Sequence, residues 1–139
     1  MATTADLSEG SAPLEKCCWP QPILSYFDWL NQNKFEQVAE LFAVAGVLVP
    51  PFERAIQGRC AIAQYLSDKA ADMTVVPIEC ERSHNLEATD AIAYLIRGNV
   101  KTSAFMVNVA WRFELNAASE ITVVRVKLLA TLQELIKFR

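Results

Sequence analysis

The segment from Val107 to Leu115 reads Val-Asn-Val-Ala-Trp-Arg-Phe-Glu-Leu, with a bulky apolar residue at every second position. A period of two is typical of a β-strand with one face in the core. The predicted inward face carries Val107, Val109, Trp111, Phe113 and Leu115. A buried tryptophan normally finds an acceptor for its ring N–H. We therefore expect a half-buried sheet with an indole on its apolar side, and the acceptor belongs either to the protein and its water or to a ligand.

The size and composition indicate one globular domain. The chain has 139 residues, of which 53% are hydrophobic and 21% charged. Such a chain can bury a core and a ligand cavity, and no apolar run approaches the roughly 18 residues of a membrane span. Residues 1–13 combine acidic residues with neither a basic start nor an apolar stretch, so we expect no targeting peptide. The prediction is a flexible tail over 1–16 and a single cytoplasmic domain over 17–139.

Charge and cysteine spacing argue against two classes of partner. The net charge is −3 and the chain has no basic run, so nucleic acid is not expected as a partner. Cys17, Cys18, Cys60 and Cys80 lack the spacing of a zinc site, and His84 is the one histidine. The cysteines are interpreted as unpaired thiols, with redox activity or an intersubunit bridge at Cys17 and Cys18 as the alternative.

The order of predicted elements is helices followed by a sheet. Helix-type spacing of apolar residues is found over about 22–31, about 35–42 and about 59–71, and a last helix is expected over 132–138. A short strand at 47–49 must lie at an edge or end early, because Pro50 and Pro51 follow it. Longer strands are expected near 73–79, 91–101, 106–115 and 121–129, with turns at 87–90 and 116–120. This order indicates an α+β domain with an antiparallel sheet curled around the first helices.

Several short motifs resemble the C-terminal domain of the cyanobacterial orange carotenoid protein family. They are Ile-Leu-Ser-Tyr-Phe-Asp-Trp-Leu-Asn at 23–31, Pro-Pro-Phe at 50–52 with Ile-Gln-Gly at 56–58, Asn-Val-Ala-Trp-Arg-Phe at 108–113, and Leu-Leu-Ala at 128–130 with a Glu-Leu and Phe-Arg ending. The likeness runs from about Ile23 to Arg139. It implies the nuclear-transport-factor-2-like cone, and a free-standing homologue of that domain that carries a carotenoid.

The resemblance also implies a site. In that family a helix tyrosine and a strand tryptophan hydrogen-bond the keto oxygen on one end ring of the carotenoid, and the matching residues are Tyr26 and Trp111. The implied cofactor is a ketocarotenoid of the echinenone or canthaxanthin type. The tunnel wall implied for its polyene consists of Met73, Val75, Val107, Val126 and Leu128. Period two independently places Val107 with Trp111 on one face, and Val126 with Leu128 on one face.

The chain departs from the family at its charged positions. The resemblance implies that Lys69 and Lys127 stand where the two-domain protein uses carboxylates to hold its N-terminal domain. Arg112 and Arg125 are also outward by parity, so we expect a basic outer face, which is either a partner surface or a solvated one. The segment 101–106 keeps Phe105 but is shorter than in the family and lacks its neighbouring tryptophan.

The implied partners follow from the size of the pigment. A rod on the order of 30 Å matches the diameter of a small domain, so we expect a homodimer that shares one carotenoid. The resemblance suggests transient membrane contact for pigment uptake, delivery to helical carotenoid proteins, and singlet-oxygen quenching by the bound polyene. The alternatives are a ketosteroid-isomerase-like or cyclase-like enzyme and a ligand-free dimerisation module. Neither Asp28 nor His84 is a convincing general base for such an enzyme.

Overall fold

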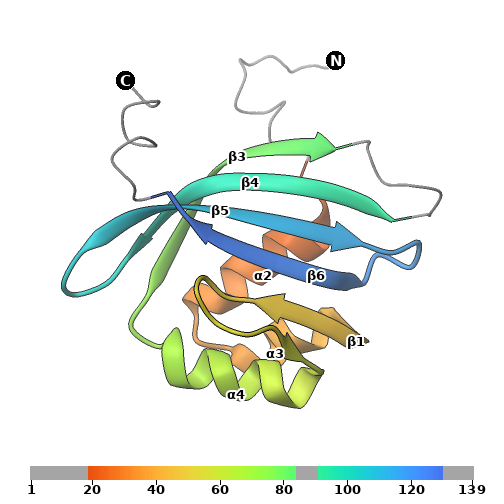
Figure 1. Ribbon diagram of the computed structural model, residues 1–139, viewed down its shortest axis with the longest axis horizontal. Coiled ribbons are helices and arrows are strands. Elements are labelled where there is room, and N and C mark those ends of the chain that lie inside the picture. The colour runs from red at the N-terminus through yellow and green to blue at the C-terminus, as the bar shows by residue number, and fades with distance from the viewer. Residues whose placement is uncertain (1–18, 84–90, 130–139) are drawn as a thin grey trace, which may run out of the picture.

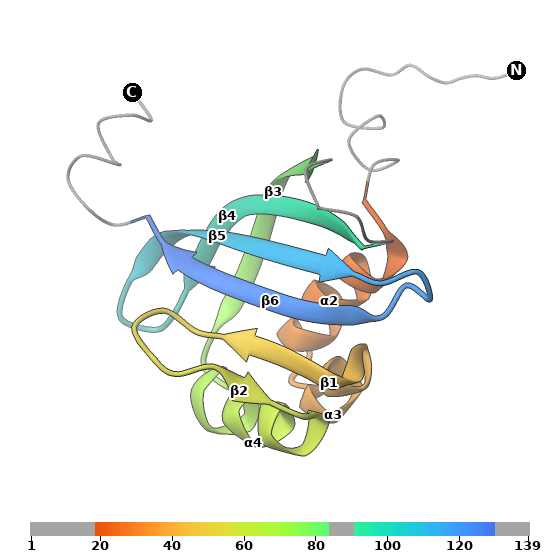
Figure 2. The ribbon, with the colours of Figure 1, turned by 45° about the vertical axis from the view of Figure 1, so that its right-hand side comes forward.

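The computed structural model describes residues 19–83 and 91–129, which form a curved sheet with three helices against one of its faces (Figure 1). The helices are α2 (Gln21–Asn31), α3 (Phe35–Glu40) and α4 (Arg59–Lys69). The strands are β1 (Phe42–Val49), β2 (Ile56–Gln57), β3 (Thr74–Ser83), β4 (Ile92–Lys101), β5 (Met106–Leu115) and β6 (Ile121–Leu128). This arrangement confirms the α+β cone. The turned view in Figure 2 shows α2 lying inside the curve of the sheet.

The first helix, α2, follows its sequence pattern closely. Pro22 sits in the first turn, where a missing N–H costs no helical hydrogen bond. Ile23, Tyr26, Phe27 and Leu30 recur at spacings of three and four, and all four are buried as predicted. The apolar stripe of α2 therefore faces the sheet and forms the centre of the core.

The sheet has the order β2-β1-β6-β5-β4-β3. All neighbouring pairs of strands are antiparallel except β1 and β6, which are parallel. The sheet is thus mixed, whereas the sequence pattern predicted a wholly antiparallel one. After β1 and β2 the chain crosses through α4 to β3 at the opposite edge of the sheet, and this crossover permits the parallel pair. The prediction was three helices followed by a sheet. In the structure the strands β1 and β2 lie between α3 and α4 in the chain, so helices and strands alternate there.

The strand β1 begins five residues earlier than its predicted start. Phe42 and Leu41 were expected to extend the buried stripe of α3, but Leu41 caps that helix and Phe42 opens the strand. The carbonyl of Leu41 accepts a hydrogen bond from the backbone N–H of Ile121, 3.0 Å away, so pairing with β6 overrides the local helical pattern. The strand ends at Val49, directly before the two prolines, as predicted.

A bulge in β3 depends on a glycine in β4. The pairing register shifts between Pro77 and Glu79, and Gly98 lies opposite Pro77. A Cβ atom on Gly98 would lie 2.1 Å from the carbonyl oxygen of Val76, so a side chain cannot be accommodated without moving backbone. The bulge, the proline and the outward carboxylates also suit an edge strand, because they discourage pairing with another sheet.

The other predicted boundaries differ by a few residues. The third helix ends at Lys69 instead of Ala71, and β3 continues to Ser83 because it stays paired with β4. The turn at 116–120 is confirmed, where the Asn116 side chain accepts hydrogen bonds from the backbone of Ala118 and Glu120. The predicted tail at 1–16, the turn at 87–90 and the last helix at 132–138 lie outside the described residues.

Candidate functional site

Tyr26 lies in the middle of α2 with its side chain in the core, and it is 2% exposed. Its ring packs edge-on against Phe113 of β5, with ring centroids 5.0 Å apart. Burial raises the pKa of the Tyr26 hydroxyl well above its ordinary value, and the nearby Tyr65 adds to this shift. The hydroxyl therefore keeps its proton and remains a hydrogen-bond donor throughout the physiological pH range.

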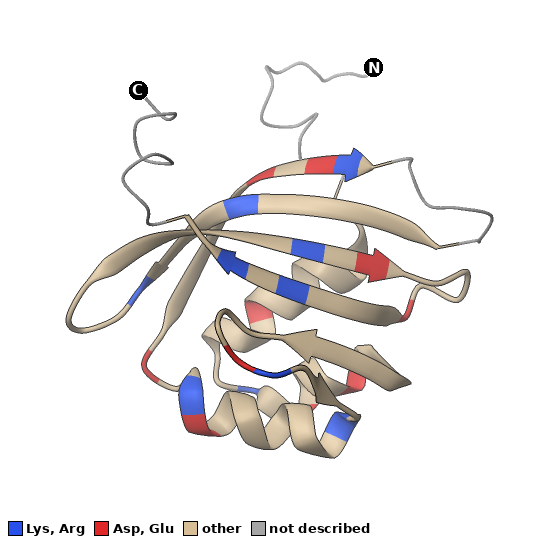
Figure 3. Ribbon diagram, in the orientation of Figure 1, with Lys and Arg blue, Asp and Glu red and all other residues tan. Residues whose placement is uncertain are grey.

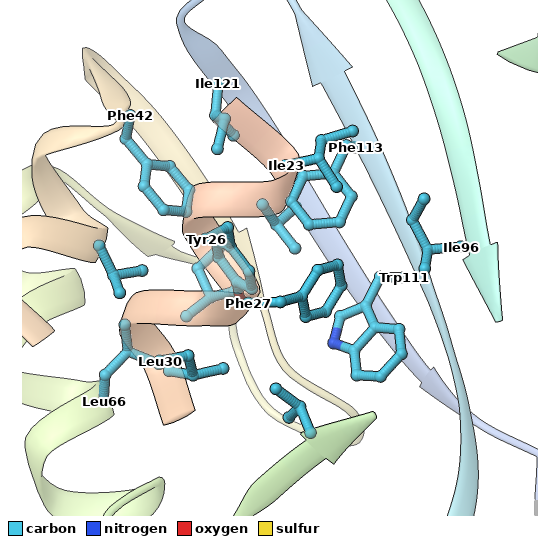
Figure 4. Close-up of a cluster of buried hydrophobic side chains, with 14 of the residues drawn as sticks. Ile23, Tyr26, Phe27, Leu30, Phe42, Leu66, Ile96, Trp111, Phe113 and Ile121 are labelled. Carbon is cyan, nitrogen blue, oxygen red and sulfur yellow. The ribbon is translucent and has the colours of Figure 1, made fainter. Parts of the chain in front are cut away.

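Trp111 lies in the middle of β5 and is also 2% exposed. It stands directly opposite Ile96 of β4 and Val126 of β6, so three neighbouring strands fix its position. Figure 4 shows its indole within the curve of the sheet, with the ring nitrogen on the side toward α2. The predicted inward placement of Trp111 is confirmed.

Phe27 connects these two residues. Its ring centroid lies 5.3 Å from that of Tyr26 and 4.8 Å from that of Trp111, and both contacts are edge-on (Figure 4). Each such ring pair stabilises the fold by about 0.5–1.5 kcal/mol more than the burial of the two rings alone. Sequence reasoning placed Phe27 on the buried stripe but did not assign it to the site. The spacing signal alone could not show that this ring separates the two donors.

The two donors have no acceptor in the described part of the protein. Within residues 19–83 and 91–129, no hydrogen bond involves the Tyr26 hydroxyl or the Trp111 ring N–H. A buried polar group without a partner costs about 1–3 kcal/mol, so most such groups in proteins are paired. In the described part of the chain the fully occluded polar atoms without a partner are Trp19 Nε1 and Asn99 Oδ1, so the Tyr26 and Trp111 donors keep some open space beside them. Two such donors close to one aromatic ring mark a place suited to an acceptor oxygen.

The residues predicted for the tunnel wall mostly share the concave face with Trp111. Val126 is opposite Trp111, and Leu128 is opposite Val109, two residues before it. Val107 is opposite Val100, which in turn is opposite Val75 of β3. These pairings form three adjacent apolar rows across the strands, from Trp111 toward the β4–β5 hairpin. Met73 precedes β3 and packs, half-buried, against the same core.

The end of α2 is fastened to β3 by Asn31. Its side-chain N–H donates to the carbonyl of Val75 at 2.9 Å, and its side-chain oxygen accepts from the backbone N–H of Val75 at 2.7 Å. The side-chain amide thus behaves like a residue of a neighbouring strand. Sequence analysis placed Asn31 only at the end of the predicted helix over 22–31, because the amide's partner lies 44 positions further along the chain.

The outer face of the sheet carries three of the predicted basic residues, Arg112, Arg125 and Lys127, whereas Lys69 lies at the end of α4. Arg112 and Arg125 are direct cross-strand neighbours, and Lys127 is opposite Ala110, which also faces Arg97. Figure 3 shows these blue positions across β4, β5 and β6, with acidic residues on β3. Arg97 is 3.2 Å from Glu79 and Arg112 is 3.6 Å from Glu114, so part of the positive charge is balanced locally.

Two surface hollows lie away from Tyr26 and Trp111. One of about 860 Å³ runs between α3 and α4 and is lined by Phe35, Ala63, Arg59 and Cys60 among others. A smaller one of about 280 Å³ lies on the outer face beside Arg97 and Asn108. Cys60 is exposed and Cys80 is half-buried, whereas Cys17 and Cys18 lie outside the described residues. In the described part of the chain, no helix is both long and apolar enough to cross a membrane.

The fold is shared with proteins of several functions. An NTF2-like protein with a cystatin-like fold from Novosphingobium aromaticivorans is 16% identical, with a TM-score of 0.65 over 92% of this chain and 91% of that chain. An epoxide hydrolase/cyclase-like enzyme of salinomycin pyran ring formation is 16% identical, with a TM-score of 0.61 over 82% of this chain and 91% of that chain. These likenesses show that the chain has the NTF2-like fold. No protein-family model matches it.

More specific similarity is to orange carotenoid-binding proteins. The chain is 35% identical over 121 residues to the protein from Synechocystis sp., covering 84% of this chain and 37% of the relative. The structure of the Anabaena (Nostoc) sp. orange carotenoid protein binding canthaxanthin has a TM-score of 0.74 and 30% identity, over 84% of this chain and 38% of that chain. The chain is therefore homologous to the C-terminal domain of orange carotenoid protein. It spans a little over a third of the length of these relatives.

Proposed function

We propose that this protein is a carotenoid carrier that binds one end ring of a ketocarotenoid between α2 and β5. The observation that carries the proposal is the pair of buried residues Tyr26 and Trp111, whose side-chain donors make no hydrogen bond within residues 19–83 and 91–129. A keto oxygen accepts two hydrogen bonds, so it suits one O–H and one N–H donor converging from opposite elements. The chain is homologous to a protein whose structure was solved with canthaxanthin bound, and this supports a pigment of the echinenone or canthaxanthin type.

The apolar rows beside Trp111 are the proposed wall for the polyene. Met73, Val75, Val107, Val126 and Leu128 offer no polar side-chain group, as contact with a hydrocarbon rod requires. Each hydrogen bond to the keto oxygen is worth about 1 kcal/mol net, so burial of the rod at about 25 cal/mol per Å² must supply most of the affinity. The two donors therefore determine which way the pigment lies, and contact with the apolar rows supplies most of the binding free energy.

Phe27 is the proposed obstacle that the pigment displaces. Because its ring contacts both Tyr26 and Trp111, a keto ring that reaches both donors takes over part of the space Phe27 fills. Binding therefore couples to a rotation of the Phe27 side chain or a shift of α2. This coupling suits a carrier, which has to release its cargo as well as bind it.

One subunit cannot enclose the whole pigment, so we propose a twofold homodimer in which each protomer holds one keto ring. In this proposal the protein works in the cytoplasm, takes up pigment from a membrane and passes it to helical carotenoid proteins. The bound polyene would quench singlet oxygen. Light scattering tests the stoichiometry, since the pigmented form should have about twice the 15.5 kDa mass of the chain. A pigmented monomer at micromolar concentration would contradict the shared-pigment arrangement.

An enzymatic function is the alternative that the fold keeps open. Ketosteroid-isomerase-like and cyclase-like catalysts need a base beside the tyrosine in the cone. Asp28 is exposed on α2, and the buried residues that the structure describes include no charged side chain. His84 lies outside the described residues. A ligand-free dimerisation module, the third class, would leave the two donors without an acceptor.

The test of the proposed function is colour. The chain is produced in cells that accumulate canthaxanthin, purified, and examined by absorption spectroscopy and native mass spectrometry. We expect a stoichiometric carotenoid with its main band shifted to the red of the free pigment. A colourless protein from coloured cells would overturn the proposal, and a different bound small molecule would favour the enzymatic alternative.

A further inference from the structure

Phe52 stands in solvent at one end of the sheet. It lies in the loop between β1 and β2 and is 93% exposed. Figures 1 and 2 both show this loop where β1 and β6 finish, at the same end of the molecule as the β4–β5 hairpin, in which Phe105 is 59% exposed. A ring that is almost wholly exposed gains little from burial. Another interaction must therefore hold Phe52 in this position.

The exposure of Phe52 breaks the alternation of burial along β1. Leu48 is 2% exposed and Pro50 is buried, so the residues at every second position face the core. Leu48 lies opposite Val124 of the parallel strand β6, and the same register continued by four residues would place Phe52 beside Leu128 on the concave face. The pattern of the strand therefore predicts an inward ring, whereas the ring points outward.

The backbone at Phe52 turns the ring away from the sheet. Its φ is 63°, in the left-handed region, which a bulky residue rarely adopts and which carries local strain. In the extended conformation of a strand φ is negative, and the ring would then continue the inward set of β1. The loop thus holds Phe52 in a conformation of higher local energy than the extended one.

A hydrogen bond from α4 fixes the loop in this conformation. The hydroxyl of Tyr65 donates to the carboxylate of Glu53 at 3.2 Å, and Glu53 is the residue directly after Phe52. Burial, together with the Glu53 charge, raises the pKa of Tyr65 to about 12, so the hydroxyl keeps its proton at physiological pH. An exposed hydrogen bond and one strained φ have similar free energies, so the bond can hold the loop without locking it.

The place that the Phe52 ring would take is apolar and only partly covered. Leu128 and Val126 are half-buried, whereas Trp111, which lies opposite Val126, is 2% exposed. A ring laid on Leu128 would remove apolar surface of both side chains from water. Burial thus favours the inward position of Phe52, and the hydrogen bond from α4 favours the outward one.

We propose that Phe52 is the lid of the pigment path and that the hydrogen bond from Tyr65 to Glu53 holds this lid open. When the bond breaks, Phe52 returns to a negative φ and its ring covers Leu128, or covers the polyene where pigment lies on Leu128. The lid rests on the proposed carrier function for its purpose, because it controls how pigment enters and leaves the path. The movement is a property of the pigment-free chain as well, so it can be measured without pigment.

The experiment places 4-trifluoromethylphenylalanine at position 52 of the pigment-free full chain and measures how strongly a soluble gadolinium chelate relaxes its fluorine signal. The test variant is Tyr65→Phe, which removes only the donor hydroxyl. Gln64→Ala is the matched control, because Gln64 donates to Asp68 at 3.1 Å in an exposed hydrogen bond on the same helix. We expect strong relaxation in the parent and the control, and about threefold weaker relaxation in Tyr65→Phe.

Two further proteins check that the response belongs to the loop. Glu53→Gln keeps an acceptor oxygen for the Tyr65 hydroxyl, so its probe should be relaxed as strongly as that of the parent. The same probe placed at Phe105 should not respond to Tyr65→Phe, because the hairpin has no part in this hydrogen bond.

Several results would overturn the lid. One is a parent whose probe at position 52 is already shielded from the chelate, and another is a Tyr65→Phe protein whose probe stays as exposed as that of the parent. Equal shielding in Gln64→Ala would mean general loosening of α4. Shielding that grows with protein concentration would mean that a second copy of the chain covers Phe52.

Release of canthaxanthin to detergent micelles separates the lid from the carrier function. Tyr65→Phe should release pigment about threefold more slowly than the parent. Phe52→Asn, which tolerates a positive φ and lacks the ring, should release it faster than the parent. Equal rates in the three proteins would overturn the position of the lid over the path. A parent that does not bind canthaxanthin contradicts the carrier function, while the fluorine measurement still decides whether the lid moves.

Discussion

Asn31 at the end of α2 exchanges two hydrogen bonds with the backbone of Val75 in β3, at 2.9 and 2.7 Å. The helix that carries Tyr26 is thereby fixed to the edge strand of the sheet that carries Trp111. Val75 also belongs to the apolar rows of the concave face. The clamp sets the spacing of helix and sheet beside the proposed polyene path, so its loss affects both stability and site geometry.

Asn31→Leu should destabilise the fold. It leaves both Val75 backbone groups unpaired, which costs about 1–3 kcal/mol of unfolding free energy. Asn31→Asp keeps the acceptor but loses the donor, so a smaller effect is expected from it. Urea unfolding followed by tryptophan fluorescence measures both variants. An Asn31→Leu protein with the parent's midpoint and slope would show that the clamp contributes nothing.

Phe27→Leu should make pigment enter faster. The change removes the edge-on contacts with Tyr26 and Trp111, and it lowers stability by about 1–2 kcal/mol, within the range for such core substitutions. Stopped-flow mixing with canthaxanthin in micelles gives the rate of colour formation. Phe42→Leu serves as the control, because the Phe42 ring lies 6.4 Å from that of Tyr26 and, in the described part of the chain, makes no ring contact with Phe27 or Trp111. Equal acceleration in both variants would indicate general loosening of the core.

The alkaline limb of the stability curve should depend on tyrosines. Burial, with Glu53 as charge and hydrogen-bond partner, raises the pKa of Tyr65 to about 12, from 10.0. The folded state therefore holds this proton more tightly than the unfolded state does. The contribution is complete below pH 10.0 and is lost as the pH rises toward about 12. Unfolding free energies measured across this window should fall less steeply in Tyr65→Phe than in the parent. An identical slope would remove Tyr65 as a cause.

The sequence anticipated the fold where the pattern is local. The stripe of α2 and the alternation of β5 depend on neighbouring residues, so Tyr26, Phe27 and Trp111 were all placed inward correctly. The parallel pairing of β1 with β6, the bulge opposite Gly98 and the Asn31 clamp each join distant segments. Periodicity carries no information on such pairings, and this explains why Phe42 was assigned to a helix.

The sequence could predict which of the candidate site residues share the concave face, but not how their side chains pack there. Parity placed Val107 beside Trp111, and the register of the strands adds Val75, Val126 and Leu128 to the same face. The motifs could not show that Phe27 lies between the two donors. They also could not show that Phe52 and Phe105 stand exposed at the same end, since that depends on how two distant loops are folded.

The central claim is that Tyr26 and Trp111 together hold the keto oxygen of the pigment, and the double variant Tyr26→Phe with Trp111→Phe tests it most directly. Both substitutions keep an aromatic ring and remove only the donors and part of one ring, so the fold should persist. Absorption spectra of the proteins purified from canthaxanthin-accumulating cells should show a blue-shifted band and about tenfold or greater loss of bound pigment, since two hydrogen bonds of about 1 kcal/mol each are removed. A double variant with the parent's band position and pigment yield would contradict the assignment.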